Sequence, residues 1–141
     1  MAMSETCKST ILSAMTGKLN YASIASTCFI GLLKSITTSS ENGTIFLEPE
    51  TSAGYGRTQL GQYQNEPGQL MGAPTNGKIT NRQIVYFPEA TADWGTVNYF
   101  ALYTSASGGS PFLWGALSEP VNIPSGYVPL FRVGKLVISI E

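Results

Sequence analysis

The clearest alternation of side chains along the chain runs from Thr96 to Thr104. Phe100 and Leu102 fall on one face of a strand, and Ala101 and Tyr103 fall on the other, because successive side chains of a strand point in opposite directions. Both faces are largely apolar, whereas a strand with one wet face carries a polar residue at every second position. The pattern therefore predicts a central strand with protein packed on both sides.

Short apolar segments separated by turn residues fill the rest of the chain. The turn at Ser107–Ser110 joins the central strand to Phe112–Leu117 and predicts a central hairpin. Further strands are predicted at Thr27–Leu33, Thr44–Leu47, around Leu60, and at Ile79–Phe87, Val121–Ile123, Tyr127–Val133 and Leu136–Ile140. Pro120 and Pro124 enclose the brief Val121–Ile123 segment and indicate an edge strand. This succession predicts an all-β fold, an antiparallel β-sandwich that is Ig-like or jelly-roll-like.

The N-terminal segment has helical spacing instead. Ser4 is a suitable N-cap, and apolar residues that include Ile11 and Met15 recur along Glu5–Thr16 before Gly17 ends the pattern. A helix of this length is not stable alone. It must dock on the sandwich edge or on a neighbouring subunit, so Ile11 and Met15 are candidate interface residues.

The predicted domain is single and spans residues 1–141, with a helical segment at 1–18 and the sandwich at 19–141. The strongest strands place six apolar side chains in its core: Phe100, Leu102, Leu113, Leu130, Ile138 and Ile140. Trp94 stands beside Gly95, which predicts that its indole lies across neighbouring backbone in the core.

Charge is scarce, at 12% of residues with a formal net charge of −1. Ordinary soluble domains carry about 25%, and the chain has no basic patch to hold nucleic acid or an anionic membrane. No apolar run has the length of a membrane span, and the start MAMSETCKST lacks the order of a signal peptide. Interface cores are depleted in charge, so we expect a homo-oligomer or a larger assembly.

Catalysis is not expected, because the chain contains no histidine. We also expect no metal and no cofactor. Cys7 and Cys28 are interpreted as structural thiols, and a disulfide between them is left open. Arg57 is interpreted as a structural ion-pair or hydrogen-bond partner. A glycan-binding module is the main alternative to a structural role, since Trp94, Tyr55, Tyr63 and Tyr99 offer rings on which a sugar can stack.

Several ordered motifs carry a family resemblance. They are TCFIGLLKS at Thr27–Ser35, GYGRTQL at Gly54–Leu60, FLWGALSEP at Phe112–Pro120, IPSGYVPLF near the end, and FPEATADWGT at Phe87–Thr96, which is the most specific. With these motifs the chain resembles small bacteriophage virion structural proteins of the tail fibre-like family.

The resemblance implies no catalytic residues and a role in protein–protein contacts within the virion. The chain would be a tail or fibre component or a capsid decoration protein, made in the host cytoplasm, with other phage virion proteins as partners. A receptor-recognition module for a host-surface glycan is the alternative. The N-terminal helix and the loops Lys34–Ser52 and Gln62–Gly77 are the predicted contact regions.

Overall fold

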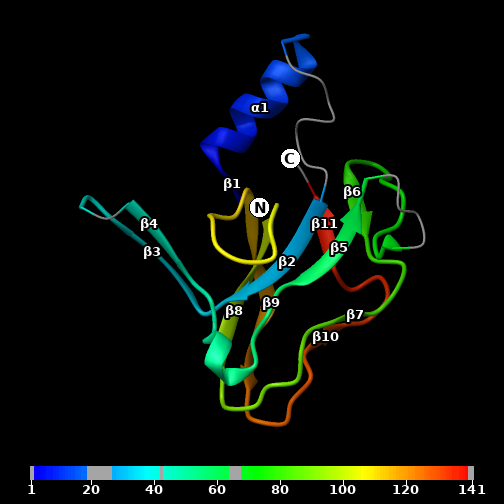
Figure 1. Ribbon diagram of the computed structural model, residues 1–141. Coiled ribbons are helices and arrows are strands. Elements are labelled where there is room, and N and C mark those ends of the chain that lie inside the picture. Colours follow the sequence, from blue (N-terminus) through cyan, green and yellow to red (C-terminus); the bar gives the residue numbers. More distant parts are fainter. Residues whose placement is uncertain (1, 19–26, 42, 64–67, 140–141) are drawn as a thin grey trace.

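A computed structural model of the chain describes residues 2–18, 27–41, 43–63 and 68–139. The described residues form mostly strands, with the helix α1 near the N-terminus (Figure 1), which confirms the all-β class with an N-terminal helix. The elements are β1 Ala2–Met3, α1 Glu5–Met15, β2 Thr27–Leu33, β3 Ser35–Ser39, β4 Gly43–Leu47, a 3-10 turn at Thr51–Ala53, β5 Thr58–Gln62, β6 Lys78–Thr80, β7 Val85–Tyr86, β8 Gly95–Tyr103, β9 Leu113–Ile123, β10 Leu130–Phe131 and β11 Val137–Ser139.

The main sheet has five strands in the order β1-β9-β8-β2-β5, and every pairing in it is antiparallel. β8 lies between β2 and β9, so the prediction of a central strand is confirmed. Leu32 of β2 faces Phe100, and Leu102 faces Leu113 of β9. The described residues also form three two-stranded ladders: β3 with β4, β6 with β11, and β7 with β10.

Each face of the main sheet has its own apolar cluster. Phe100, Leu102, Leu113 and Ile138 are buried in the larger one, as predicted, between the sheet and the ladders β6–β11 and β7–β10. The smaller cluster holds Leu33, Ala101 and Tyr103, and Phe46 of β4 packs against it. The ring of Phe46 meets that of Trp114 edge-on, with centroids 4.8 Å apart.

The burial predicted for Leu130 is wrong, because its side chain is 41% exposed. The predicted strand Tyr127–Val133 is reduced to the two residues of β10, and within it Pro129 and Phe131 face the core instead. The side-chain period of a strand is two, so an error of one residue in register moves the wrong side chains inward. The other core prediction that remains, Ile140, lies outside the described residues.

The single strand predicted at Ile79–Phe87 is also wrong. Residues 81–84 separate β6, which pairs with β11, from β7, which pairs with β10. The break is at Asn81, whose buried amide donates to the carbonyls of Arg132 at 3.0 Å and Gln83 at 2.8 Å and accepts from the Leu136 amide at 3.0 Å. A buried amide must find such partners. Asn81 therefore holds the turn between β10 and β11.

β9 is one strand of 11 residues, which corrects the prediction of two segments separated at Pro120. Val97 faces Val121, and Tyr99 faces Ala116, so the residues 117–120 of β9 lie opposite the single residue Asn98. This bulge accommodates Pro120 at the outer edge of the sheet, where its missing N–H costs no ladder bond.

The N-terminal helix begins and ends close to the predicted positions. Ser4 is its N-cap and accepts a hydrogen bond from the Cys7 amide at 3.1 Å, and Thr16 is its C-cap. Ser4 also ties the helix to the sheet, because its amide donates to the Phe112 carbonyl at 2.9 Å.

The region Lys34–Ser52 is more regular than predicted. The sequence indicated a surface connection with an edge strand at Thr44–Leu47, and the structure adds β3 as its partner. Figure 1 shows the β3–β4 hairpin projecting away from the body.

Candidate assembly surfaces

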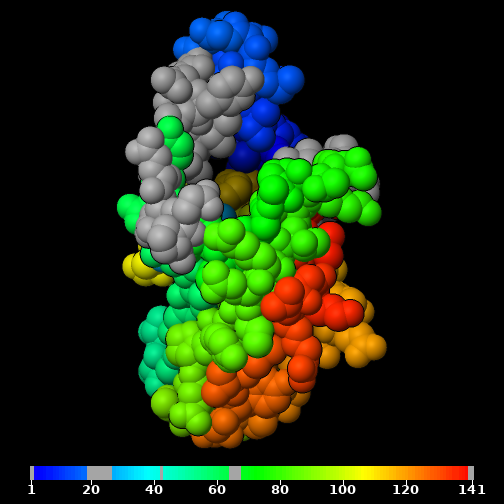
Figure 2. Space-filling model, turned by 90° about the vertical axis from the view of Figure 1, so that its right-hand side faces the viewer, coloured from blue at the N-terminus to red at the C-terminus, as the bar shows by residue number. Residues whose placement is uncertain are grey.

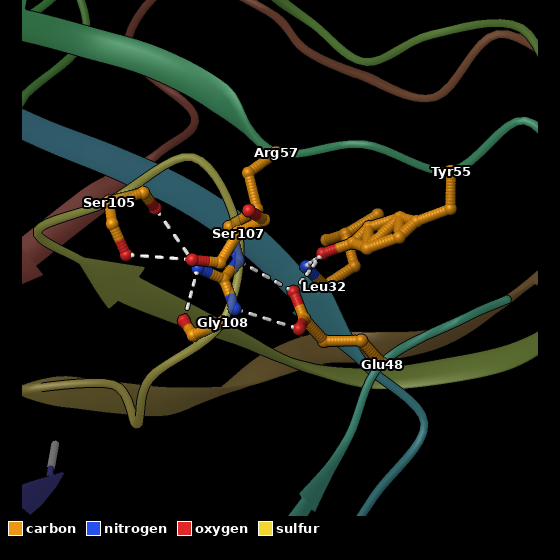
Figure 3. Close-up of polar contacts among 7 residues, drawn as sticks. All are labelled: Leu32, Glu48, Tyr55, Arg57, Ser105, Ser107 and Gly108. Carbon is orange, nitrogen blue, oxygen red and sulfur yellow. Dashed lines mark hydrogen bonds and ion pairs between the residues drawn. The ribbon is translucent and has the colours of Figure 1, made fainter. Parts of the chain in front are cut away.

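A cluster of polar side chains fixes the base of the β3–β4 hairpin (Figure 3). Arg57 precedes β5, and Glu48 follows β4. The Arg57 Nε and Nη2 donate to the two carboxylate oxygens of Glu48, each at 2.9 Å. Nη1 donates to the carbonyls of Ser105 at 3.0 Å and Gly108 at 2.9 Å in the loop between β8 and β9. The expected structural role of Arg57 is confirmed, since it joins the hairpin, β5 and this loop.

Tyr55 and Gly31 complete the cluster. The Tyr55 hydroxyl donates to Glu48 Oε1 at 2.6 Å and accepts from the Leu32 amide at 3.1 Å. A Cβ atom at Gly31 would lie 2.6 Å from that hydroxyl oxygen, so only glycine lets the tyrosine approach β2 this closely. The Arg57 guanidinium also lies over the ring of Tyr103, 3.3 Å from its centroid.

The protonation states of the cluster are set by burial and by the charge of Glu48. Burial, and then the hydrogen bond and charge of Glu48, raise the pKa of Tyr55. Burial, followed by the charge of Glu48, raises the pKa of Tyr103 to about 12. Burial opposes the charge of Arg57, but the hydrogen bond and charge of Glu48 outweigh it and raise the arginine pKa. Both tyrosines therefore stay neutral at neutral pH beside the Arg57–Glu48 ion pair.

Two of the residues expected to bind ligand or partner lie in the core. Trp94 is 1% exposed, and its Nε1 donates to the Ala53 carbonyl at 2.8 Å. Its ring meets that of Tyr55 edge-on at 5.2 Å. The expectation of a core tryptophan is confirmed, and neither ring presents a face to a sugar.

The other three expected residues lie at or near the surface around α1. Tyr63 and Met15 are each 66% exposed. Ile11 lines a cleft of about 450 Å³ between α1 and the sheet, together with Cys7 and Cys28, and Figure 2 shows α1 standing clear of the body above a hollow. Ile11 is half-buried beside this cleft, whereas Met15, one turn further along the same side of the helix, is exposed.

Both thiols in this cleft are free. Burial raises the pKa of Cys7, and it raises that of Cys28 to about 12. Such thiols are poor nucleophiles at neutral pH, in keeping with a structural role.

Sequence reasoning missed three features of these surfaces. Glu48 was not identified from the sequence as the partner of Arg57, and Gly31 was not identified either, although a glycine inside a strand signals a close approach. The third is a groove between β9 and the β10–β11 segment, made of two adjoining hollows of about 660 and 170 Å³. Their shared lining includes the exposed side chains of Tyr127 and Leu130.

Within the described ranges there is no cluster of acidic, cysteine or histidine side chains that would hold a metal ion. A search of the same residues for a helix long and apolar enough to cross a membrane found none.

Comparison with known proteins adds one finding. A family model described as podophage GP4 fiber I protein gp80 matches residues 2–139 of the chain. Among curated proteins no match was found.

Proposed function

Since the chain belongs to the podophage GP4 fiber I protein gp80 family, we propose that it is a fibre-associated subunit of the virion tail that works as a repeated homo-oligomeric unit. A phage fibre protein interacts with other virion proteins. The fibre position is favoured over capsid decoration because the family description names a fibre protein and the match spans residues 2–139. On this proposal the subunit is made in the host cytoplasm and incorporated during assembly.

The exposed face of α1 supports a role in contacts between subunits. Leu12 and Met15 are 61% and 66% exposed, and they lie on the same side of the helix, three residues apart. Only Ala14 of the helix is fully buried. An amphipathic helix of this length gains its stability from packing, so its outer stripe is suited to burial against another chain.

Electron microscopy of phage particles labelled with an antibody to this protein tests the proposed position. We expect the label on the tail fibres, and a label on the capsid would overturn the fibre assignment. Deletion of residues 1–16 should reduce both the copy number per particle and the oligomeric mass in solution. If the truncated protein kept both, α1 would serve only as an intramolecular cover.

Glycan binding has less support than a structural role. Of the four aromatic rings considered, those of Trp94 and Tyr55 are buried, and Tyr99 is half-buried against the smaller apolar cluster. Tyr63 is exposed. A Tyr63→Ala variant tests this alternative, because loss of adsorption to host cells with unchanged virion incorporation would favour a receptor-binding module.

A further inference from the structure

The tip of the β3–β4 hairpin, here residues 39–41 and 43–45, has little support within its own chain. Figure 1 shows that it extends beyond the body, and a two-stranded hairpin is only marginally stable in water. Ile45 at the tip is 47% exposed. Glu41 is the one charged residue between Ser35 and Leu47, and it is exposed. The tip therefore presents an apolar side chain close to a single carboxylate.

The groove between β9 and β10–β11 complements the hairpin tip, because it combines apolar side chains with positive charge. Its larger hollow is lined by apolar side chains that include Leu117, Leu130 and Val137, and by Arg132 and Lys135. In the part of the chain that the structure describes, neither cation forms an ion pair. The smaller hollow contains Glu119, so the cationic end is the one that suits an acidic partner.

The two surfaces lie on opposite sides of the molecule. In Figure 1 the hairpin projects from one side, and β7 and β10 lie on the other. Figure 2 shows the segments from β10 to β11, coloured orange to red, on the face that the hairpin does not reach. The hairpin tip therefore does not enter the groove of its own chain. Any contact between a hairpin tip and a groove must join two copies of the chain.

We propose that the groove of one copy receives the β3–β4 hairpin tip of the next copy. Glu41 pairs with Arg132 and Lys135, and Ile45 lies against the apolar lining beside them. This inference rests on the proposed function, because it requires a repeated subunit. The contact joins two different surfaces, so it repeats from copy to copy and yields a ring or an open fibre. Main-chain pairing along β9 is a poorer route, since the bulge containing Pro120 interrupts that edge.

Charge exchange in the purified chain tests the contact. Glu41→Arg alone, or Arg132→Glu with Lys135→Glu, places like charges together and should weaken self-association at least about tenfold at low salt. The triple variant restores opposite charges in every contact and should recover the wild-type association. Sedimentation velocity across a concentration series measures the constants, and circular dichroism confirms that each variant is folded. Glu89→Arg and Lys78→Glu are the matched controls, because both residues are exposed and lie outside the hairpin tip and the groove.

A second measurement identifies the residues in contact. Carbodiimide coupling of a mixture of isotopically labelled and unlabelled chains should give a Glu41–Lys135 cross-link between two different chains. A monomer at all concentrations, unchanged association in the Glu41→Arg variant, or a triple variant that stays weak would overturn the inference. If the protein is found on virion fibres and self-associates, but the Glu41→Arg or the triple variant gives one of these contrary results, the inference falls and the proposed function stands. A monomer at all concentrations would overturn both the inference and the homo-oligomeric part of the proposed function. Binding of an acidic polysaccharide that is lost in Arg132→Glu/Lys135→Glu without a change in self-association would assign the groove to a glycan and overturn it as well.

Discussion

The Arg57–Glu48 ion pair should contribute far more stability than an ordinary surface pair. The Arg57 side chain is 3% exposed and that of Glu48 is 25% exposed. Arg57→Met keeps an apolar stem over Tyr103 but removes all four hydrogen bonds that the guanidinium makes. It also leaves the Glu48 carboxylate with the Tyr55 hydroxyl as its remaining protein donor.

The expected cost of Arg57→Met follows from this geometry. Breaking a fully buried pair costs about 3–5 kcal/mol because one charge is left uncompensated. Water reaches part of Glu48, and the carbonyls of Ser105 and Gly108 belong to an exposed loop and can be hydrated. We therefore expect a loss of about 2–4 kcal/mol. Glu48→Gln keeps an acceptor for Tyr55 and Arg57, so its cost should be about 1–3 kcal/mol.

Urea denaturation of the wild type, the two single variants and the double variant measures the coupling between the residues. We expect a coupling free energy of about 1–3 kcal/mol, since the two side chains share one network. Glu5 and Lys8 on α1 are the control, because their exposed pair should couple by no more than about 0.5 kcal/mol. A coupling as small as this control for Arg57 and Glu48 would refute the reasoning.

Three further predictions concern stability. Gly31→Ala should cost about 1–3 kcal/mol in the same assay, because its Cβ would overlap the Tyr55 hydroxyl; an unchanged midpoint would contradict the close approach. The unfolded state loses the Tyr103 proton near pH 10, whereas the folded state keeps it to about pH 12. The free energy of unfolding should therefore fall as the pH rises across that window. If the free energy of unfolding of a Tyr103→Phe variant fell as steeply in an alkaline titration, this account would be contradicted. Phe100→Ala should cost about 3–5 kcal/mol, and Leu130→Ala should cost less than about 1 kcal/mol as a half-exposed control; equal losses in chemical denaturation would show that the core assignment is wrong.

Local pattern was sufficient to predict the centre of the fold. Alternation along β8 placed it inside a sheet and placed Phe100 and Leu102 in the core. Ser4 and the helical spacing after it predicted α1. These features depend on residues close together in sequence, where side-chain period and capping chemistry decide the outcome.

Features that depend on distant partners were not predicted. Asn81 splits an apparently continuous strand because its amide binds carbonyls some fifty residues later, at Phe131 and Arg132. Pro120 remains within β9 because the bulge opposite Asn98 releases it from the ladder. In both cases the local sequence pattern agrees with the predicted strand boundaries, but contacts with residues distant in sequence set different boundaries in the fold.

The same division applies to the candidate surfaces. The structural role of Arg57 was predicted, but its partner Glu48 was not, since the two meet only when the hairpin folds back beside β5. Tyr55 was a candidate for ligand stacking because an aromatic ring beside glycines gives no sign of burial. The groove is formed by side chains from β9 and the C-terminal segment, so no single stretch of sequence indicates it.

The pairing of β1 with β9 has a consequence for the order of folding. Ala2 lies opposite Trp114, so β1 acquires its partner only after the residues between it and β9 have been made. Contacts this distant in sequence form slowly. Until β9 has been made, β1 has no strand to pair with in its own chain and can pair with the β9 of another nascent chain. Where many copies are translated together, β1 is thus open to exchange between subunits.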